Sequence, residues 1–593
     1  MSEFTFNSPQ IPEMLISNDP TSLFGNTGAP QRPSSVFSSG QTTKQKYNEL
    51  FHEVELYLDN SGNFNGKPEN RFHINPASVL SMNITDTFMD WVTDGYMAFM
   101  YLPEDVPDED LAGQTSDTKV QGAKDNGNLL KSYKFRADGF DLLRVMIRPV
   151  VDNNEPASGN PLPINSENPN WCLSFLFSIY DVEDVVNVPG SHEIASSYMK
   201  CLKLYFRDIR YQILKTTNLE YSTATSKDYT PNFNSGLDNE GVLKVGDAML
   251  EVFNKALGNP ETGGSLEFQQ MDGSDKWDKG GNEIFYTSPA EYSAFDDIEY
   301  LYSHHVSSNP LQNSDINDIC ILHSDRATTP TLLGPVCLTP LSQLFAKAGK
   351  TADGPGELQL EHFFVSTYAT GTEKGKEENT DVTRRYKAPM GTQEDRDIKT
   401  AKYGQILSYS FVDMSPEINS SIFSTFPVYS VDIAERKFNV EFQKNTVENA
   451  RKLIADAYIS QLYKNDSNNE DLFLSTLHRQ KESQNRFPTF SLYGDNPLTR
   501  QKNGIHQLLY TGLFQNTCIC FKTLGLTLRQ SGTFIAIDRI DGSKSDDYNN
   551  KLYGQWLVVK VDHVFEAGKY LNAIYAVKIH RFESLKQKFE GTI

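Results

Sequence analysis

The triplet Gly349-Lys350-Thr351 is the part of the sequence that could bind a nucleotide phosphate. In a phosphate-binding loop, another glycine precedes this triplet by five residues, and the loop follows a β-strand. Leu344 stands at that position, and the residues before it have the pattern of a helix. The sequence therefore predicts no nucleotide site, and neither the HExxH nor the GxSxG motif of hydrolytic enzymes occurs in the chain.

The histidines and cysteines are the side chains that could bind a metal. His304 and His305 are adjacent at the end of a predicted helix, so they face different sides, and the helix dipole favours histidine there. Cys518 and Cys520 lie on one face of a predicted strand, where we expect packing in a core. No CxxC pair occurs, so we expect reduced thiols. The histidines, cysteines and motifs of the chain supply no metal site, cofactor site or catalytic residue that we would predict. The 77 acidic residues leave open a hydrolase that uses two carboxylates.

Residues 554–582 have the features of a β-hairpin, with two runs rich in Val, Ile, Tyr, Phe and Trp around a polar turn at Gly568. Strict alternation places two apolar sets on opposite faces: Leu557, Val559, Val561 and Phe565 on one, and Trp556, Val558 and Val564 on the other. We therefore expect one face to pack on a core and the other to contact a second chain. Trp556 and Val558 are the candidate interface residues. A strand buried on both faces within one chain is the alternative.

Four segments with different patterns follow one another along the chain. Residues 1–45 form an extended polar arm, which is either disordered or ordered on a neighbouring subunit. Strand patterns dominate 46–235, helical patterns dominate 236–354, and strand patterns return in 355–593. The predicted fold is therefore α+β and mainly β, with two small antiparallel β-barrel domains flanking a helical module.

The helices are predicted from apolar periodicity and from capping residues. One amphipathic helix covers 242–256, and a second follows Ser288, with Glu291 as its capping partner. A third helix is expected to begin at Thr339-Pro340, and a fourth, at 445–463, is inserted in the second β domain.

Charge and hydropathy bound the classes of function. The formal charge of −22 repels the phosphates of nucleic acids, which argues against tight nucleic-acid binding but would suit a conduit that DNA must pass without sticking. No apolar run is long enough to cross a membrane, and the N-terminal residues lack the pattern of a signal peptide. We therefore expect a protein of a cytosol-like compartment.

The predicted hairpin resembles a known pattern, G-x-W-x-V-x-x-V-x-H-x-F-x(4)-Y, which closes the second barrel of tail hub proteins. These are the central hubs of contractile-tailed phage baseplates, with relatives among phage late-control proteins and VgrG spikes. The residues that carry the resemblance are Gly554, Trp556, Val558, Val561, His563, Phe565 and Tyr570, followed by Arg581. Residues 524–540 and 201–223 are similar to two further hub segments. The chain departs from compact hubs by its arm and by surplus loops at 103–128, 152–170 and 370–400.

The resemblance implies a homotrimer in which two barrels per subunit form a pseudo-sixfold ring. Such a ring joins the hexameric tail tube to the trimeric spike, lets DNA pass, and contacts baseplate wedge proteins. It implies a virion protein of the tail baseplate, assembled in the host cytoplasm, with no catalysis and no specific nucleic-acid binding. We expect acidic side chains to be enriched on the channel face of the ring. A tail-associated cell-wall hydrolase and a peripheral receptor-binding tail protein are the alternatives.

Overall fold

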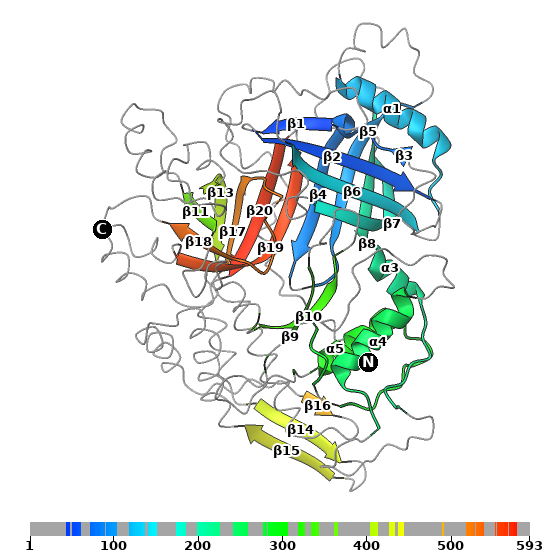
Figure 1. The fold of residues 1–593 in the computed structure, drawn as a ribbon, viewed down its shortest axis with the longest axis vertical. Helices are drawn as coiled ribbons and strands as arrows, with labels where there is room; N and C mark the ends of the chain where they lie inside the picture. Colours follow the sequence, from blue (N-terminus) through cyan, green and yellow to red (C-terminus); the bar gives the residue numbers. More distant parts are fainter. Residues whose placement is uncertain are drawn as a thin grey trace, which may run out of the picture.

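The fold is described from a computed structural model of the chain. Apart from a few residues inside these ranges, the structure describes 43–60, 72–103, 118–150, 173–185, 199–225, 241–258, 277–307, 318–325, 334–343, 361–365, 404–412, 426–443, 489–491, 518–538 and 552–577. Most of the predicted arm, the loops at 152–170 and 370–400 and the helix at 445–463 lie outside the described residues. Figure 1 shows the large sheet at one end of the molecule and the helices α4 and α5 nearer the other.

The first β region is an antiparallel sheet. Its strands lie in the order β2 (Leu50–Asp59), β6 (Asp141–Val150), β7 (Leu173–Val185), β8 (Lys200–Asp208), β5 (Asp94–Tyr101) and β4 (Val79–Thr87). Two shorter strands, β1 (Thr43–Tyr47) and β3 (Phe72–His73), pair with β2. Alternate side chains point to one face, where they form a core that includes Leu56, Val145, Phe177 and Phe206.

Helix α1 (Thr118–Ser132) packs against β5 and the short 3-10 helix η2 (Pro76–Ser78). The prediction of a surplus loop over 103–128 was therefore wrong for its last residues. The polar sequence of α1 contains two glycines, which disfavour a helix on propensity alone. A Cβ atom added at Gly127 would lie 2.0 Å from the Leu102 carbonyl oxygen, so glycine permits a close approach that stabilises the helix from outside.

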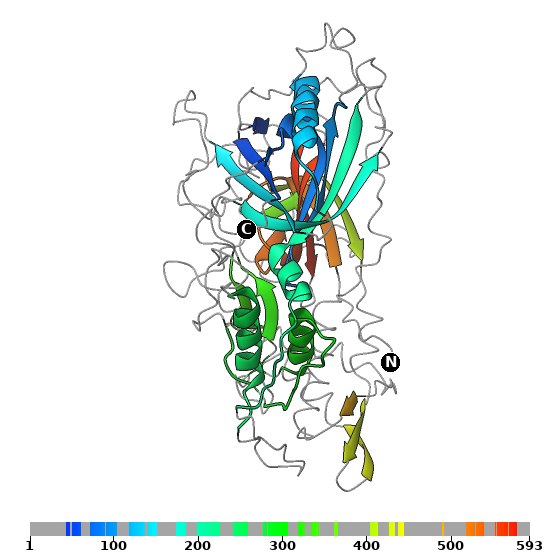
Figure 2. The same ribbon diagram turned by 90° about the vertical axis from the view of Figure 1, so that its right-hand side faces the viewer.

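The helical part of the chain contains α3 (Ile209–Thr216), α4 (Val245–Leu257) and α5 (Ala294–His304), with the antiparallel pair β9 (Cys320–Ser324) and β10 (Val336–Pro340). Figure 2 shows α3 between the large sheet and the other two helices. Helix α4 confirms the amphipathic helix predicted at 242–256, and its apolar stripe packs in a second core with α5.

The helix start predicted at Ser288 was wrong. Helix α5 begins at Ala294, where Ser293 is the N-cap and forms a capping box with Asp296. Ser288 instead donates a 2.7 Å hydrogen bond to the Asp297 carboxylate. Thr339 and Pro340 are the last two residues of β10, and the helix predicted to begin there starts directly after them, since Leu341 and Gln343 are helical. A serine followed by an acidic residue at i+3 recurs in this segment, so the motif alone did not select the cap.

The second β region contains β11 (Glu361–Val365), β12 (Gln405–Ile406), β13 (Ser408–Val412), β17 (Cys518–Leu524), β18 (Phe534–Asp538), β19 (Gly554–Glu566) and β20 (Lys569–Val577). The pairings run from β19 through β18 and β11 to β12, and from β13 through β17 and β20 back to β19. Strands β12 and β13 follow one another in the chain and are separated by one residue, and among the described residues they do not pair with each other. Closed barrels in the two β regions stay a prediction.

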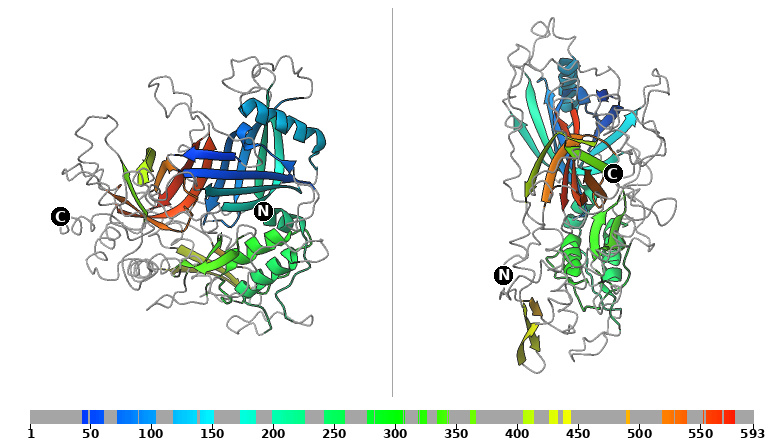
Figure 3. Two further views of the ribbon diagram at one scale, coloured as in Figure 1. Left: turned by 45° about the horizontal axis from the view of Figure 1, so that its top comes forward. Right: turned by 90° about the vertical axis from the view of Figure 1, so that its left-hand side faces the viewer.

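The two β regions form one continuous sheet, because β19 pairs with β4 in antiparallel register. Figure 3 shows β19 and β20 between the strands of the first region and those of the second. A separate sheet contains β14 (Phe426–Asp432), β15 (Lys437–Gln443) and β16 (Thr489–Ser491). The fold is mainly β with a large antiparallel sheet, as the sequence predicted. Among the described residues, none of the helices combines the length and the apolar composition needed to cross a membrane.

Candidate functional site

The terminal hairpin is the part of the chain for which the sequence predicted an assembly function. Strands β19 and β20 confirm the hairpin, and their register shifts by one residue between Val558 and Lys560. Such a bulge adds one residue to one strand, so the alternation of side chains inverts beyond it. Trp556 and Val558 therefore face the same core as Val561, and not the opposite side as strict alternation predicted.

The structure places both candidate interface residues inside the chain itself. Trp556 is fully buried and Val558 is 2% exposed. The indole Nε1 of Trp556 donates a 2.9 Å hydrogen bond to the Leu552 carbonyl oxygen, and the ring of Phe411 meets the indole edge-on. These contacts match the alternative of a strand buried on both faces. A role of Trp556 and Val558 in a subunit interface stays a prediction, and neither side chain is exposed in the single chain.

The polar residues of the hub-like motif form a buried network. His563, Tyr570 and Asn572 are each fully buried. Nδ1 of His563 lies 2.8 Å from the Tyr570 hydroxyl oxygen and 3.1 Å from Nδ2 of Asn572. Because the amide nitrogen can only donate, Nδ1 is the acceptor and the proton of a neutral ring lies on Nε2. The histidine of the motif therefore lies in the interior, where its Nδ1 has two hydrogen-bond partners.

Asn572 and Arg529 extend this network to strand β11. Oδ1 of Asn572 accepts hydrogen bonds from the Leu526 amide at 2.7 Å and from Nη1 of Arg529 at 3.2 Å. The same guanidinium donates to Oε1 of Glu361 through Nε at 2.9 Å and Nη2 at 2.7 Å. Hydrogen bonds to a charged group are stronger than neutral ones, so the pair ties β11 to the hairpin.

The tip of the hairpin completes the core of the first β region. Phe565 and Tyr570 stack with ring centroids 4.4 Å apart, and both belong to the core cluster of that region. The Gly525 amide donates a 2.9 Å hydrogen bond to the Tyr570 carbonyl oxygen, and a Cβ atom added at Gly525 would lie 2.4 Å from the Tyr570 ring. The residues 554–577 therefore belong to the cores of both β regions at once.

Polar side chains reinforce the pairing of β4 with β19. The Thr85 hydroxyl donates a 2.8 Å hydrogen bond to Oδ1 of Asp562, and Lys560 lies 3.2 Å from the same oxygen. The Ser531 amide and hydroxyl each donate a 3.0 Å hydrogen bond to the Asp86 carboxylate. Burial raises the pKa of Asp562, while Lys560 and the hydrogen bond from Thr85 oppose that shift.

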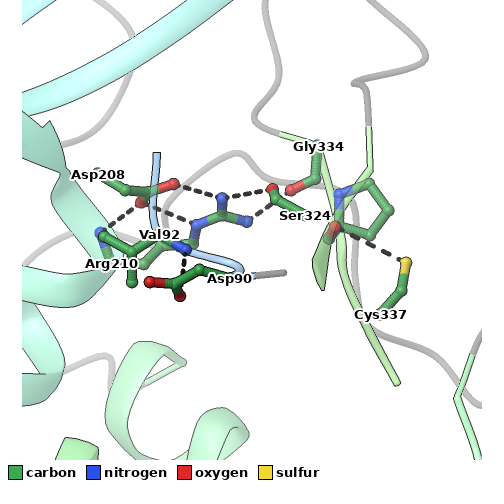
Figure 4. Close-up of polar contacts among 8 residues, drawn as sticks. Asp90, Val92, Asp208, Arg210, Ser324, Gly334 and Cys337 are labelled. Carbon is green, nitrogen blue, oxygen red and sulfur yellow. Dashed lines mark hydrogen bonds and ion pairs between the residues drawn. The ribbon is translucent and has the colours of Figure 1, made fainter. Parts of the chain in front are cut away.

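A buried arginine joins the first β region to the helical part (Figure 4). The Arg210 guanidinium donates to both carboxylate oxygens of Asp208, at 2.9 Å through Nε and 2.5 Å through Nη2. It also donates to the Gly334 carbonyl oxygen at 2.6 Å and to the Ser324 hydroxyl at 3.0 Å. Asp208 is the N-cap of α3 at the end of β8, so this ion pair fixes the β9–β10 hairpin against the large sheet.

Large apolar side chains are exposed in both β regions. In the first region these are Tyr180 at 47% and Val182 at 36%, on β7. In the second they are Leu407 at 50% and Tyr409 at 46%, at the start of β13. The guanidinium of Arg207 lies 4.4 Å from the centre of the Tyr180 ring. These residues could not be predicted from the sequence, because one exposed ring in a strand has no sequence signature of its own.

The histidines, cysteines and Gly-Lys-Thr triplet, which were considered as metal or phosphate ligands, lie in different parts of the chain. His304 is the last residue of α5, as predicted for the helix end, and its Nδ1 lies 2.8 Å from the Tyr300 carbonyl oxygen. Cys518 and Cys520 share one face of β17 but are only half-buried, while the residues between and beyond them point to the core. Burial raises the pKa of each thiol to about 11. The Gly349-Lys350-Thr351 triplet lies outside the described residues.

No protein-family model matches the sequence, and no curated protein matches it. Solved structures are similar to the chain. A prophage MuSo2 43 kDa tail protein from Shewanella oneidensis is 8% identical, with 89% of this chain and 99% of that chain covered, at a TM-score of 0.40. A tail protein from Neisseria meningitidis MC58 is 8% identical, with 89% and 98% covered, at 0.39. A chain of the half-lidded Francisella PdpA-VgrG complex is 9% identical, with 90% and 58% covered, at 0.38.

Proposed function

We propose that this chain is the structural hub of a phage tail baseplate and has no catalytic activity. The observation that carries the proposal is the position of the hub-like motif. Trp556, Val561, His563, Phe565 and Tyr570 are all buried, and they join the terminal hairpin to both β regions. A motif with these contacts serves to hold two β regions together, and it offers no reactive group to a substrate.

The proposed assembly is a homotrimer that forms a pseudo-sixfold ring. A chain with two β regions contributes two such units, so three copies present six. The ring joins the hexameric tail tube to the trimeric spike in the virion tail and contacts the baseplate wedge proteins. An adapter of this kind must keep its two units at a fixed angle. The continuous sheet through β4 and β19 supports this requirement, because the two regions cannot rotate without breaking backbone hydrogen bonds.

Neighbouring subunits in a ring make a head-to-tail contact, in which two different surfaces of the chain meet. The exposed pair Tyr180 and Val182 lies in the first β region, and the exposed pair Leu407 and Tyr409 lies in the second. We assign these two patches to the contact between one subunit and the next. Aromatic side chains are enriched at such interfaces because each buries a large apolar area.

The ring surrounds a path for DNA. The charge of −22 keeps duplex DNA from binding to the wall, since the phosphate backbone is repelled by an excess of carboxylates. Acidic side chains that line the path would let DNA slide without being held.

The mass of the purified chain in solution tests the proposal. Light scattering should give the mass of a trimer. Tyr409→Glu and Tyr180→Glu should lower the mass to that of a monomer with an unchanged circular dichroism spectrum. Phe285→Glu is the matched control, because Phe285 is 39% exposed but lies outside both patches. It should remain a trimer.

A wild-type chain that stays monomeric at its highest soluble concentration, with and without added spike protein, would contradict the assembly. Release of soluble fragments from purified peptidoglycan would instead support the hydrolase that the sequence left open. Binding to intact host cells would support the receptor-binding alternative.

A further inference from the structure

Three side chains with metal-binding atoms meet in the helical part of the chain. Asp278 follows the bridge between Trp277 and Leu338, His305 is the C-cap of α5, and Cys320 is the first residue of β9. One ligand atom of each lies within 4.8 Å of the others. The side chains of His305 and Asp278 are 2% and 3% exposed, and Cys320 is 7% exposed. The group is thus shielded from solvent.

The three segments that carry these side chains are fixed by other contacts. Nε1 of Trp277 donates a 2.9 Å hydrogen bond to the Gly246 carbonyl oxygen on α4. The Tyr302 hydroxyl donates a 3.2 Å hydrogen bond to the Cys320 carbonyl oxygen, and the His305 amide donates to the Tyr302 carbonyl oxygen at 3.1 Å. The ligand atoms are therefore held near one another by the fold itself, as a preformed site requires.

The distances between the ligand atoms suit a tetrahedral ion. Sγ of Cys320 donates a 3.3 Å hydrogen bond to Oδ2 of Asp278, and Nε2 of His305 lies 3.6 Å from the same oxygen. Bonds of about 2.0–2.3 Å from Zn²⁺ to N, O and S place neighbouring ligand atoms of a tetrahedron about 3.3–3.6 Å apart. A separation of 3.6 Å is too long for a hydrogen bond from an imidazole nitrogen to a carboxylate oxygen. The separation of Nε2 from Oδ2 is therefore close to that of two ligands of one ion.

The His305 ring also lacks a hydrogen bond that would explain its position. Nε2 of His305 has no hydrogen-bond partner among the described residues, although it is buried. A buried polar atom without a partner destabilises the folded state. A bound cation would satisfy this nitrogen.

We propose that Asp278, His305 and Cys320 bind one Zn²⁺ ion, which ties the end of α5 and the start of β9 to the segment at 277–281. Thiolate and imidazole ligands favour Zn²⁺ over Mg²⁺ and Ca²⁺, which prefer oxygen. Asp318 is 1% exposed and interacts electrostatically with Cys320, which makes its carboxylate the candidate for a fourth ligand. The ion is structural, because all three ligands come from the protein and the site is closed to solvent.

Elemental analysis of the full chain tests this site. Protein produced with added zinc and purified without chelator should contain one zinc ion per chain. His305→Ala and Cys320→Ala should each lose the zinc. Cys201→Ala is the matched control, because Cys201 is 5% exposed on β8, outside the group, and its variant should keep the ion.

A second measurement uses the wild-type chain alone, so it does not depend on the folding of a variant. Removal of zinc by a chelator should lower the melting temperature by several degrees, and zinc but not magnesium should restore it. Cobalt added in place of zinc should give the near-ultraviolet absorption band of a thiolate ligand. A wild-type chain with no zinc, no cobalt band and no change in melting temperature would overturn the proposal. Loss of zinc from the Cys201→Ala control would overturn the assignment to these three residues.

Discussion

The hydroxyl of Thr85 donates a 2.8 Å hydrogen bond to the carboxylate of Asp562, although the two residues are 477 positions apart in the sequence. This contact joins β4, in the first β region, to β19, in the terminal hairpin. Asp562 is 4% exposed, so its carboxylate depends on the few groups that surround it. The pair therefore makes the stability of the junction sensitive to pH.

Stability should fall as pH rises past the ordinary range of a carboxylic acid. Burial raises the pKa of Asp562 in the folded chain above its ordinary value of 3.8. The folded state then holds its proton more tightly than the unfolded state, so this contribution is present below pH 3.8 and is lost as pH rises through the raised pKa. Asp562→Asn should flatten that part of a plot of melting temperature against pH. Thr85→Val removes a hydrogen bond that lowers the pKa, and it should extend the fall to higher pH. Equal slopes in all three proteins would show that Asp562 does not titrate in this way.

Val558→Glu should unfold the second β region and not merely separate subunits. Val558 is 2% exposed in the core of that region, where a carboxylate has no partner. The expected cost is above about 3 kcal/mol in the free energy of unfolding, measured by denaturant titration. Tyr409→Glu, at a side chain that is 46% exposed, should leave this free energy nearly unchanged. A soluble Val558→Glu protein with normal stability but no trimer would restore the interface that the sequence suggested.

Gly525→Ala should destabilise the hairpin tip. The added methyl group would lie 2.4 Å from the Tyr570 ring, which is stacked on Phe565 and cannot move freely. Overpacking of this kind costs about 1–3 kcal/mol. Gly532→Ala is the comparison, because Gly532 has φ +75° but its nearest neighbour, Phe88, is 3.6 Å away from an added Cβ. Its cost, from backbone strain alone, is about 1–2 kcal/mol. Urea unfolding of both variants should rank Gly525→Ala as the more damaging, and the reverse order would refute the steric argument.

Arg210→Leu should loosen the β9–β10 hairpin. The substitution leaves the Asp208 carboxylate buried without its main partner and removes the hydrogen bonds to Gly334 and Ser324. Breaking one side of a buried ion pair costs about 3–5 kcal/mol. Hydrogen exchange should become faster in β9 and β10 before it does in β6 and β7. The double variant Arg210→Leu with Asp208→Asn should recover part of the loss, since it removes the unpaired charge. No recovery would mean that the arginine acts through packing alone.

The sequence predicted those elements whose patterns are local. The hairpin at 554–577 and helix α4 each show their period within one stretch of chain, and both are present. The faces of β19 were not predictable, because the bulge after Val558 follows from the register with β4 and β20 and not from the composition of the strand. Helix α1 was missed for a similar reason, since its stability comes from contacts with β5 and η2.

The candidate sites were predicted less well than the fold. The sequence pointed to His305 only as one of two adjacent histidines at a helix end, and not as part of a metal site. Its neighbours, Asp278 and Cys320, are 27 and 15 positions away, a spacing that matches no metal motif. Arg210 was not singled out either, because a buried arginine is recognised only from the groups that surround it. Periodicity identifies faces and elements, whereas such groups of side chains arise from the tertiary fold.

The pairing of β4 with β19 also has a consequence for the order in which the nascent chain folds. Strand β4 leaves the ribosome long before its partner, since 477 positions separate Thr85 from Asp562. During that interval β4 presents a free edge, and the core that Phe565 and Tyr570 later complete lacks both rings. Exposed edges and unfilled cores invite association with the wrong chain. The first β region therefore stays incomplete until β19 and β20 have been synthesised. A chaperone that covers the edge of β4 during this time would raise the yield of folded protein.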